Sequence, residues 1–600
     1  MKINELNFMI GGKSGEGIEV PGNMFAQICM HAGLYLHVTQ EFYSVIKGYN
    51  NINQIRASEK PVRSHSNHYD LVLAIDDETV PRYLDDIVPG GGLIYDPALV
   101  TDEAVKQSQV QSGGAPIYDK EELKKKLEAA DIKRFPVPLA ALAKEKAGFA
   151  LAKNIVGIGA TMGLLDYEIQ PLLDLIVKTF ARKGDEIVNK NIDAAQAGYN
   201  YVREHFAREF NYQLRPVKDS AKKFFVNGNE AIVFGAIKAG CKFVSEYPMT
   251  PSSSVLHAMA KHSHQYDISV NHVEDELAAI NMAVGAGYAG VRSLAGTSGG
   301  GFALMTEAIG MAGMIEAPVV IVEAQRPGPS TGLPTRSGQG DLRTAMHASQ
   351  GEFPRIVMSP GTHEESFYMS FEAFNLAERY QCPVILLTEK YLAEGHATVP
   401  FLNTDHLVVD RGKLLKEEEI TEEFKRYQVT EDGIPPRTIP GQKGGAHTAT
   451  TYEHLESGYF TEEVEDVNKM FERRMKKMKT IEANMPAAQL EGDEDAEITI
   501  VCWGATYMPA SEAVDLLARD GIKANLLHIK YMLPLQPGVR EILENSKHPV
   551  IIEANYTAQL AGVIAEKVGI DIQDKILDYS GRPFTPDQIY RAIKGLKNKN

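Results

Sequence analysis

The stretch "AGTSGGGFALMTE", residues 295–307, has the pattern of a strand end, a glycine-rich turn and the start of a helix. Three successive glycines let a ligand or another backbone approach such a turn closely. Strand-like runs on both sides alternate with alanine-rich helical segments; they are "SVNHV" (269–273), "PVVIVEA" (318–324) and "PVILLTE" (383–389). Since this alternation is typical of a sheet covered by helices, it predicts an α/β domain over residues 223–400.

One further α/β domain is predicted before this domain and another after it. Residues 1–200 alternate short apolar runs, such as "YDLVLAID" (69–76), with longer amphipathic stretches. Residues 495–600 contain three apolar runs separated by helical patterns, which predicts parallel strands. Residues 401–494 are rich in charged and polar side chains, so we expect a largely solvated connector with one helix around residues 462–482 and no chemistry in its charge runs.

The bulk composition narrows the class of protein. The 600 residues carry a formal net charge of −17, which argues against a general nucleic-acid binder and against binding to an anionic membrane surface. The apolar run from 301 to 324 is interrupted by Glu307 and Glu316, so it predicts buried core and not a membrane span. The first residues have no secretory signal pattern, and the four cysteines are scattered. We therefore expect a reducing cytoplasm, and no metal site or iron–sulfur cluster on this chain.

Residues 9–20, "MIGGKSGEGIEV", contain the end of a nucleotide-binding phosphate loop without its beginning. The full motif requires a glycine where Asn7 stands, and the glycine spacing also fails the dinucleotide fingerprint. What remains is a predicted strand over residues 6–10, a glycine-rich turn and a helix over residues 20–32. Such a unit either presents backbone N–H groups to an anion at the helix N-terminus or is a plain turn.

Two stretches of the central domain carry hydroxyl and carboxyl groups that packing alone does not require. "SEYPMTPSSS" (245–254) combines two prolines with a cluster of hydroxyls, which either bind an anion at a helix N-terminus or simply cap that helix. In "NHVEDELAAINMAVGAGYAG" (271–290), Glu274, Asp275 and Glu276 open a helix. They are either first-turn acids favoured by the helix dipole, or one of them is a carboxylate in an apolar site with a raised pKa, suited to proton exchange.

A long polar loop, "EAQRPGPSTGLPTRSGQGDL" (323–342), interrupts the same domain. Loops of this length inside a compact domain are more often functional than not. Arg326 and Arg336 in this loop, with Arg343 just beyond it, are candidate partners for a carboxylate, which a guanidinium group binds through two parallel hydrogen bonds.

Taken in order, these motifs resemble those of the α subunits of 2-oxoacid:ferredoxin (acceptor) oxidoreductases, in the form with the γ domain fused at the N-terminus. The family patterns correspond to Tyr247–Ser253, "TSGGGF" (297–302), Gly332–Leu342, "SQGEFPR" (349–355) and "IIEANYTAQLAGVIAEKVG" (551–569). The resemblance covers nearly the whole chain. Gly300 stands where the family usually has proline, and Ala558 stands where a glycine is common.

The resemblance implies a domain order and a reaction. The implied parts are a Rossmann-like γ domain associated with coenzyme A at 1–200, a pyrimidine-binding thiamine diphosphate domain at 223–400, the connector at 401–494 and a transketolase C-terminal-like domain at 495–600. The implied reaction is oxidative decarboxylation, in which a 2-oxoacid and coenzyme A give acyl-CoA, carbon dioxide and two electrons for ferredoxin. 2-Oxoglutarate or a broad range of 2-oxoacids is the expected substrate, with pyruvate or branched-chain 2-oxoacids as alternatives. A non-catalytic subunit, or a thiamine-dependent transferase without the redox step, also stays open.

Residue roles follow from the same resemblance. Glu276, with Glu274 as the alternative, is expected to be catalytic, by hydrogen bonding to the aminopyrimidine of thiamine diphosphate and driving its proton exchange. The other residues expected to bind the cofactor are Thr297, Ser298 and Gly299. The residues expected to bind the 2-oxoacid are Tyr247, Thr250, Pro251, Ser252 and Arg336. The residues expected to lie near the phosphates of coenzyme A are Gly12, Lys13, Ser14 and Gly15.

The chain lacks two parts that this reaction requires. It contains no GDG motif for the diphosphate and Mg²⁺, and no cysteine cluster for a [4Fe-4S] cluster. The resemblance therefore implies that both lie on a separate β subunit, in an (αβ)₂ assembly that passes electrons to ferredoxin. We expect the isolated chain to be inactive.

Overall fold

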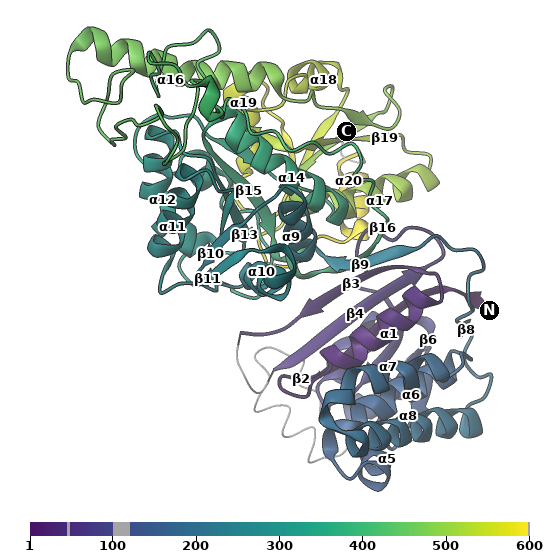
Figure 1. Ribbon diagram of the computed structural model, residues 1–600. Coiled ribbons are helices and arrows are strands. Elements are labelled where there is room, and N and C mark those ends of the chain that lie inside the picture. Colours follow the sequence, from purple (N-terminus) through teal and green to yellow (C-terminus); the bar gives the residue numbers. More distant parts are fainter. Residues whose placement is uncertain (45–48, 100–119, 598–600) are drawn as a thin grey trace. The chain divides into compact units, whose positions relative to one another are not determined.

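The computed structural model describes residues 1–44, 49–99 and 120–597. The chain forms two compact units: Met1–Phe225 with Gly395–Phe401, and Val226–Glu394 with Leu402–Asn600. Each unit is built around its own sheets (Figure 1). In the described part of the chain, no helix is long and apolar enough to cross a membrane.

Eight strands form one mixed sheet in the first unit. They are β2 (Glu5–Lys13), β3 (Tyr35–Glu41), β4 (Asn50–Ser58), β5 (Tyr69–Ala74), β6 (Ile87–Tyr95), β7 (Lys133–Pro136), β9 (Lys223–Asn227) and β16 (His396–Pro400), in the order β7-β6-β5-β2-β4-β3-β16-β9. β2, β5, β6 and β7 run parallel, whereas β4 is antiparallel to both β2 and β3. The parallel half agrees with the predicted Rossmann-like fold, and the antiparallel half extends it.

Helices and two short strands complete the first unit. They are β1 (Lys2–Ile3), α1 (Glu19–His31), α2 (Thr79–Tyr83), α4 (Lys120–Ala129), α5 (Leu139–Lys146), α6 (Lys153–Leu164), α7 (Gln170–Phe180), α8 (Asp185–His205) and β8 (Tyr212–Gln213). Apolar side chains of α1, α6 and the sheet form one core, in which Phe8, Phe25, Leu73 and Ile158 are fully buried. This core fixes the position of the N-terminal glycine turn between β2 and α1.

The segment Gly395–Phe401 belongs to the first unit, although the predicted central domain runs to residue 400. β16 within it pairs antiparallel with β3, and Leu36 N–H donates to the Thr398 hydroxyl at 2.9 Å. The short sequence "HATVP" (396–400) has no pattern from which its partner strand could be predicted. The sheet edge that it joins is contributed by residues more than 350 positions away in the sequence.

The second unit contains a seven-stranded sheet in the order β11-β10-β12-β13-β15-β14-β20 and a five-stranded sheet in the order β17-β19-β18-β21-β22. The strands of the first are β10 (Phe243–Glu246), β11 (Ser269–His272), β12 (Ser293–Thr297), β13 (Val319–Gln325), β14 (Ile356–Met358), β15 (Pro383–Glu389) and β20 (Tyr531–Leu533). Those of the second are β17 (Leu490–Glu491), β18 (Ile498–Trp503), β19 (Ala524–Ile529), β21 (Pro549–Glu553) and β22 (Asp574–Leu577). Both sheets are parallel except for β20 and β17.

Helices cover both sheets of the second unit (Figure 1). The main ones are α9 (Gly228–Lys238), α10 (Ser253–Tyr266), α11 (Glu276–Tyr288), α12 (Gly299–Met314), α14 (His363–Tyr380), α16 (Val464–Asn484), α17 (Tyr507–Arg519), α19 (Gln559–Val568) and α20 (Pro586–Lys597); shorter ones are α13 (Leu342–Met346), α15 (Lys390–Glu394) and α18 (Val539–Asn545). β13 and β15 are buried along their whole length, as expected for parallel strands covered on both faces. One core cluster contains Ile321, Val501 and Ile551 from both sheets, so the two α/β layers form one unit.

Most residues of the connector are exposed or half-buried, as predicted, and α16 agrees with the expected helix. The connector also contributes buried basic side chains, which the prediction did not include. Arg426, Arg437, Arg473 and Lys477 from this segment are at most 3% exposed. Because buried charges require partners, this region is packed against the α/β layers through specific ion pairs.

Candidate active site

Several buried polar residues gather where neighbouring parallel strands of the seven-stranded sheet end. Glu246 ends β10, Thr297 ends β12 and Glu389 ends β15. Ligands of α/β sheets bind beyond the carboxyl ends of the strands. The residues of the second unit that the resemblance assigns to the cofactor or the 2-oxoacid end or follow β10, β11, β12 and β13 in the sequence.

The loop after β10 is held from three sides. Asn229 donates to the Pro251 oxygen at 2.9 Å, and Arg326 donates to the Thr250 oxygen at 2.7 Å. Ser252 is fully buried and its hydroxyl donates to Glu246 Oε1 at 2.6 Å. The Ser252 hydroxyl therefore ties the loop to the end of β10. Tyr247, by contrast, is 39% exposed.

Glu276 differs from the two acids that precede it. Asp275 is the N-cap of α11 and accepts a hydrogen bond from Ala278 N–H at 2.8 Å, and Glu274 is exposed. Glu276 is only 3% exposed, and its Oε1 has no hydrogen-bond partner among the described residues. Of the three carboxylates, this one is buried with an oxygen available for a ligand.

The glycine-rich turn lies directly against Glu276. A methyl group at Gly301 would collide with the Glu276 carboxylate and the Thr297 hydroxyl, so no larger residue fits there. Ser298 is the N-cap of α12, and its buried hydroxyl has no hydrogen-bond partner in the described residues. The turn thus brings two buried polar groups without partners, Glu276 Oε1 and Ser298 Oγ, to the first turn of α12.

Two further acids, Glu323 and Asp341, lie at the ends of the long polar loop. Glu323 is fully buried and Asp341 is half-buried, and burial together with the charge of the neighbouring Asp341 raises the pKa of Glu323 well above its ordinary value. Burial also raises the pKa of Asp341, and a methyl group at Gly299 would lie 2.7 Å from its Oδ2. The pair therefore holds at least one proton near neutral pH and joins the ends of the loop to the glycine-rich turn.

Gln339 connects this loop to the C-terminal layer. Its side-chain amide donates to Glu389 Oε1 at 2.7 Å and to the Trp503 oxygen at 2.8 Å, and its side-chain oxygen accepts from Ala554 N–H at 2.9 Å. Its own N–H donates to the Ala554 oxygen at 2.8 Å. Burial raises the pKa of Glu389 to about 8. Gln339 is thus the residue through which the carboxyl ends of β15, β18 and β21 hold the loop.

The three candidate arginines have different partners. Arg326 holds the Thr250 carbonyl, and Arg343 forms an ion pair with Glu566 at 2.6 Å. Arg336 is half-buried, and a methyl group at Gly581 would lie 2.9 Å from its Cβ. Arg326 is therefore tied to the loop after β10, Arg343 to α19, and Arg336 packs against Gly581 of the C-terminal layer.

Sequence patterns missed most of the supporting residues. No role is predicted from the sequence for four residues that line the strand ends or hold the loops there: Glu246, Glu323, Gln339 and Glu389. A signal did exist for the glutamates, because each follows an apolar run at a strand end, as in "VIVE" (320–323) and "ILLTE" (385–389). An acid at such a position is buried and rarely tolerated for packing alone.

The N-terminal glycine turn differs from its prediction. β2 continues through both glycines to Lys13, beyond the predicted end at residue 10, because its whole length pairs with β4. Lys13 Nζ contacts Asp77 at 2.6 Å, and its N–H donates to Glu16 at 3.1 Å. Ser14 N–H donates to the Tyr49 oxygen at 2.8 Å. The turn is therefore rich in carboxylates, and Gly15 and Gly17, with φ of 88° and 69°, take the backbone conformation that favours glycine.

Comparisons with known proteins cover nearly the whole chain. Residues 234–473 match the family model described as pyruvate flavodoxin/ferredoxin oxidoreductase, thiamine diphosphate-binding, and residues 7–201 match that of pyruvate ferredoxin/flavodoxin oxidoreductase. The α subunit of 2-oxoacid:ferredoxin oxidoreductase 1 from Sulfurisphaera tokodaii is 35% identical over 99% of this chain and 98% of its own. The 2-oxoglutarate oxidoreductase subunit KorA of Mycobacterium tuberculosis is 27% identical over 99% of this chain and 92% of its own. A solved 2-oxoglutarate:ferredoxin oxidoreductase from Magnetococcus marinus superposes with a TM-score of 0.88 at 30% identity, covering 99% of both chains.

These matches place the chain among oxidoreductases that contain a thiamine-diphosphate-binding domain. Within that class, the chain belongs to the family of 2-oxoacid:ferredoxin oxidoreductase α subunits. The resemblance drawn from the motifs and the predicted fold class are both confirmed.

Proposed function

We propose that this chain supplies the aminopyrimidine half of a thiamine diphosphate site in an enzyme that converts a 2-oxoacid and coenzyme A to acyl-CoA and carbon dioxide, with two electrons passing to ferredoxin. The observation that carries the proposal is the Glu276 carboxylate. It is buried, its Oε1 has no partner among the described residues, and it faces a turn where only glycine fits. A flat ring that donates a hydrogen bond fits this arrangement.

The proposed role of Glu276 is to accept a hydrogen bond from the pyrimidine ring and hold its proton during exchange. Bound thiamine diphosphate supplies a nucleophilic carbon that attacks the keto group of the 2-oxoacid. Thr297, Ser298 and Gly299 border the same turn, and the Ser298 hydroxyl is a second buried polar group without a partner in the described chain. Burial strengthens such hydrogen bonds because water does not compete for them.

The 2-oxoacid is proposed to lie over the loop after β10. Thr250 and Tyr247 are its accessible polar residues, while Pro251 and the buried Ser252 keep its shape. Arg336 is the proposed partner of the substrate carboxylate, and Arg326 acts through its hold on Thr250. 2-Oxoglutarate or a broad range of 2-oxoacids is the proposed substrate, because the solved relative from Magnetococcus marinus holds 2-oxoglutarate, coenzyme A and succinyl-CoA.

The first unit is proposed to help bind coenzyme A. Gly12, Lys13, Ser14 and Gly15 keep this assignment as a proposal, although Lys13 Nζ is paired with Asp77 and the N–H groups of Lys13 and Ser14 already donate to Glu16 and Tyr49. Gly15, with φ of 88°, is the position of the turn at which a side chain is least tolerated. A Lys13→Met change should therefore raise the KM for coenzyme A by less than a Gly15→Val change. Steady-state kinetics on the two-subunit enzyme measure both.

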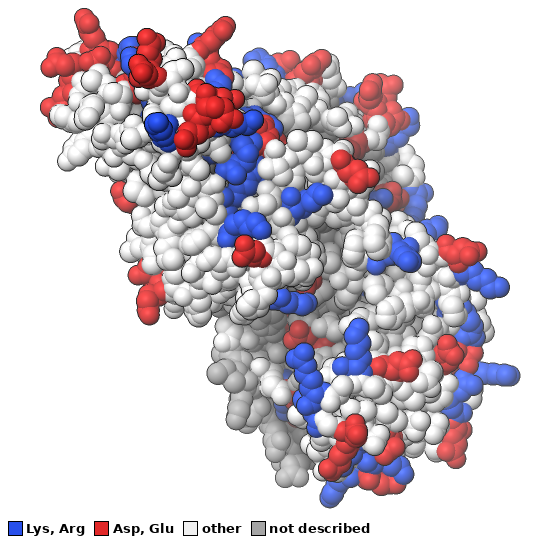
Figure 2. Space-filling model, viewed as in Figure 1, with Lys and Arg blue, Asp and Glu red and all other residues white. Residues whose placement is uncertain are grey.

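A β subunit is proposed to cover α11 and α12 and to bring the diphosphate, Mg²⁺ and the [4Fe-4S] cluster. Leu277, Met282 and Leu304 on these helices are 39–49% exposed, and a methyl group at Gly285 would meet no neighbour within 4 Å. Figure 2 shows few charged side chains over α11 and α12. Apolar surface next to the cofactor residues is what an obligate partner would bury.

The test is a pair of glutamine variants in the reconstituted complex with its β subunit. Glu276→Gln should lower kcat for 2-oxoacid-dependent dye reduction by about 10²-fold or more, which is the usual contribution of a positioned proton-transfer group. Glu274→Gln, an exposed neighbour, is the matched control and should change it less than about twofold. Unchanged turnover in Glu276→Gln would overturn the proposal, and activity of the α chain alone would overturn the shared site.

Comparing pyruvate, 2-oxoglutarate and 2-oxoisovalerate as substrates of the same complex tests specificity. The expected order places 2-oxoglutarate first by kcat/KM. An Arg336→Lys variant should lose more kcat/KM than kcat, because lysine cannot form two parallel hydrogen bonds to a carboxylate.

A further inference from the structure

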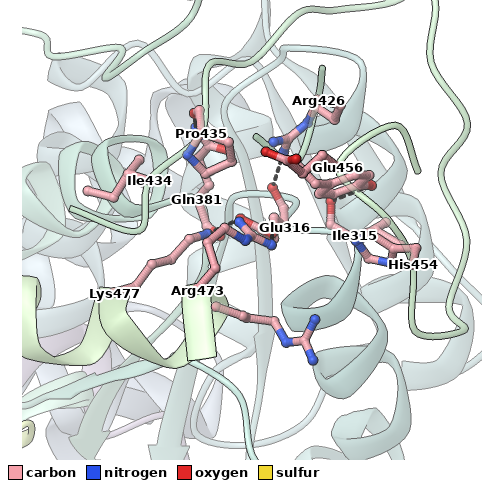
Figure 3. Close-up of polar contacts among 12 residues, drawn as sticks. Ile315, Glu316, Gln381, Arg426, Ile434, Pro435, His454, Glu456, Arg473 and Lys477 are labelled. Carbon is pink, nitrogen blue, oxygen red and sulfur yellow. Dashed lines mark hydrogen bonds and ion pairs between the residues drawn. The ribbon is translucent and has the colours of Figure 1, made fainter. Parts of the chain in front are cut away.

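A fully buried ionic cluster lies where the connector meets the central α/β layer, away from the strand ends. Glu316, just after α12, forms ion pairs with Arg473 and Lys477 of α16 (Figure 3). Arg426 donates from Nη2 to the Glu316 backbone oxygen at 2.9 Å. All four side chains are at most 2% exposed. Three cationic groups therefore meet a single carboxylate.

Several donors of this cluster have no acceptor. Arg473 Nε and Nη1 and Arg426 Nη1 are buried and lack a hydrogen-bond partner among the described residues. Another nearby carboxylate, Glu453, is held by Arg474 at 2.6 Å. His454 is buried too, and burial lowers its pKa, so it is neutral and neither adds nor removes charge at neutral pH.

The excess positive charge cannot be removed by deprotonation. Arginine keeps its proton in proteins. Burial lowers the pKa of Lys477 to about 8, which leaves it mostly protonated at neutral pH. Although burial alone would raise it, Arg473 and Lys477 hold the pKa of Glu316 well below its ordinary value, so the carboxylate is already fully ionised. Taking unpaired charge out of water costs several kcal/mol per ion, and a water molecule satisfies an N–H group without neutralising it.

We propose that a small inorganic anion, of the size and charge of chloride, binds between the guanidinium groups of Arg426 and Arg473. Both guanidinium groups contact Glu316, Arg426 through the backbone oxygen at 2.9 Å and Arg473 through the carboxylate, so their unpaired N–H groups lie around the same residue. Besides burial, the positive charge of Arg473 lowers the pKa of Arg426. Side chains enclose both groups, with the Tyr427 ring 5.0 Å from the Arg426 guanidinium carbon, which favours a single-atom anion over phosphate. The anion balances the excess positive charge around Glu316 and stabilises the packing of α16 and the connector against the α/β layers.

The direct test is a crystal of the two-subunit enzyme grown with bromide in place of chloride. The expected result is an anomalous bromine peak within hydrogen-bonding distance of Arg426 and Arg473, and loss of that peak in Arg426→Met. The matched control is Arg379→Met, which removes a guanidinium group paired with Asp410 at 2.7 Å and should keep the peak. Water or no density between the two guanidinium groups would overturn the proposal.

A solution measurement distinguishes a structural ion from one bound only in the crystal. The Tm of the wild-type complex is followed in sodium chloride against sodium gluconate at constant ionic strength. A saturable rise with chloride is expected in the wild type and in Arg379→Met, and its loss in Arg426→Met, because an anion that binds only the folded state stabilises it. A bromide peak without a chloride-dependent Tm would mean an adventitious ion only and would overturn the structural role. If Arg426→Met does not fold, the wild-type map and Tm series decide the question without it.

Discussion

Two buried regions of the second unit use carboxylates in opposite ways. At the strand ends, Glu246 and Glu389 have no ion pair among the described residues, and burial raises the pKa of each to about 8. At the connector, Glu316 and Glu378 are equally buried but face arginines and a lysine. The difference teaches that burial alone does not decide whether an acid is charged: the neighbouring cations do.

The comparison separates groups that can hold a proton from groups that only hold the fold together. Protonated acids near a ligand site can hydrogen bond as donors, and the paired acids cannot. The same change of glutamate to glutamine should therefore have opposite consequences in the two regions.

Glu316→Gln should have the largest effect. It leaves Arg473 and Lys477 buried without a carboxylate, and loss of one partner of a buried pair costs about 3–5 kcal/mol. Urea unfolding of the purified complex should show a correspondingly lower free energy of unfolding. Glu566→Gln, which removes an exposed partner of Arg343, is the control and should leave the unfolding midpoint unchanged. A Glu316→Gln variant as stable as the wild type would remove the distinction between the two regions.

Gly301→Ala should cost activity more than stability. The added methyl group collides with Glu276 and Thr297, and a displacement of about 1 Å at a reacting group lowers turnover by roughly 10²-fold. Dye-linked turnover of the reconstituted enzyme measures the loss. Gly300→Ala, where a methyl group meets nothing within 4 Å, should keep wild-type turnover. Equal activity in both variants would mean that Glu276 tolerates movement and is not positioned by the turn.

How much of this site the sequence could predict depends on the range of the interactions. Strands such as β13 and β15, and the N-cap region before α11, follow from local patterns. Local patterns left three acids open at the start of α11; the family resemblance selects Glu276, and its role stays a prediction. The Gln339 contacts did not, because they join residues more than 160 positions apart. The connector was misjudged because a run of charges has the same composition whether it faces water or a buried partner.

Glu246→Gln should change stability with the opposite sign to Glu316→Gln. The folded chain keeps a proton on Glu246 up to about pH 8, whereas the unfolded chain releases it near its ordinary value of 4.5. Between these values the folded state binds more protons, so the free energy of unfolding falls as pH rises. Glutamine can still accept the Ser252 hydrogen bond and has no proton to lose. The free energy of unfolding of Glu246→Gln should therefore fall less steeply with pH than that of the wild type, and the two slopes should differ by at most about 1.4 kcal/mol per pH unit.

Urea unfolding of the wild type, Glu246→Gln and Glu274→Gln between pH 5 and 8 measures this slope. The exposed Glu274 is the control, and its variant should follow the wild type. An identical slope in all three proteins would mean that Glu246 is ionised in the folded chain, and the strand ends would then resemble the connector.

Gly300→Pro should have the smallest effect and sharpens the contrast between the two neighbouring glycines. Gly300 lies in the first turn of α12, where proline is tolerated because the N–H groups have no partner within the helix. Open space around the position leaves room for the ring, and the loss of flexibility in the unfolded chain should raise the free energy of unfolding by about 0.4–1 kcal/mol. Turnover should stay at the wild-type value, since the Glu276 side of the turn is formed by Gly301. A Gly300→Pro variant with lost turnover would instead show that the N–H of Gly300 itself contacts a ligand, and the turn would then belong to the binding site on both sides.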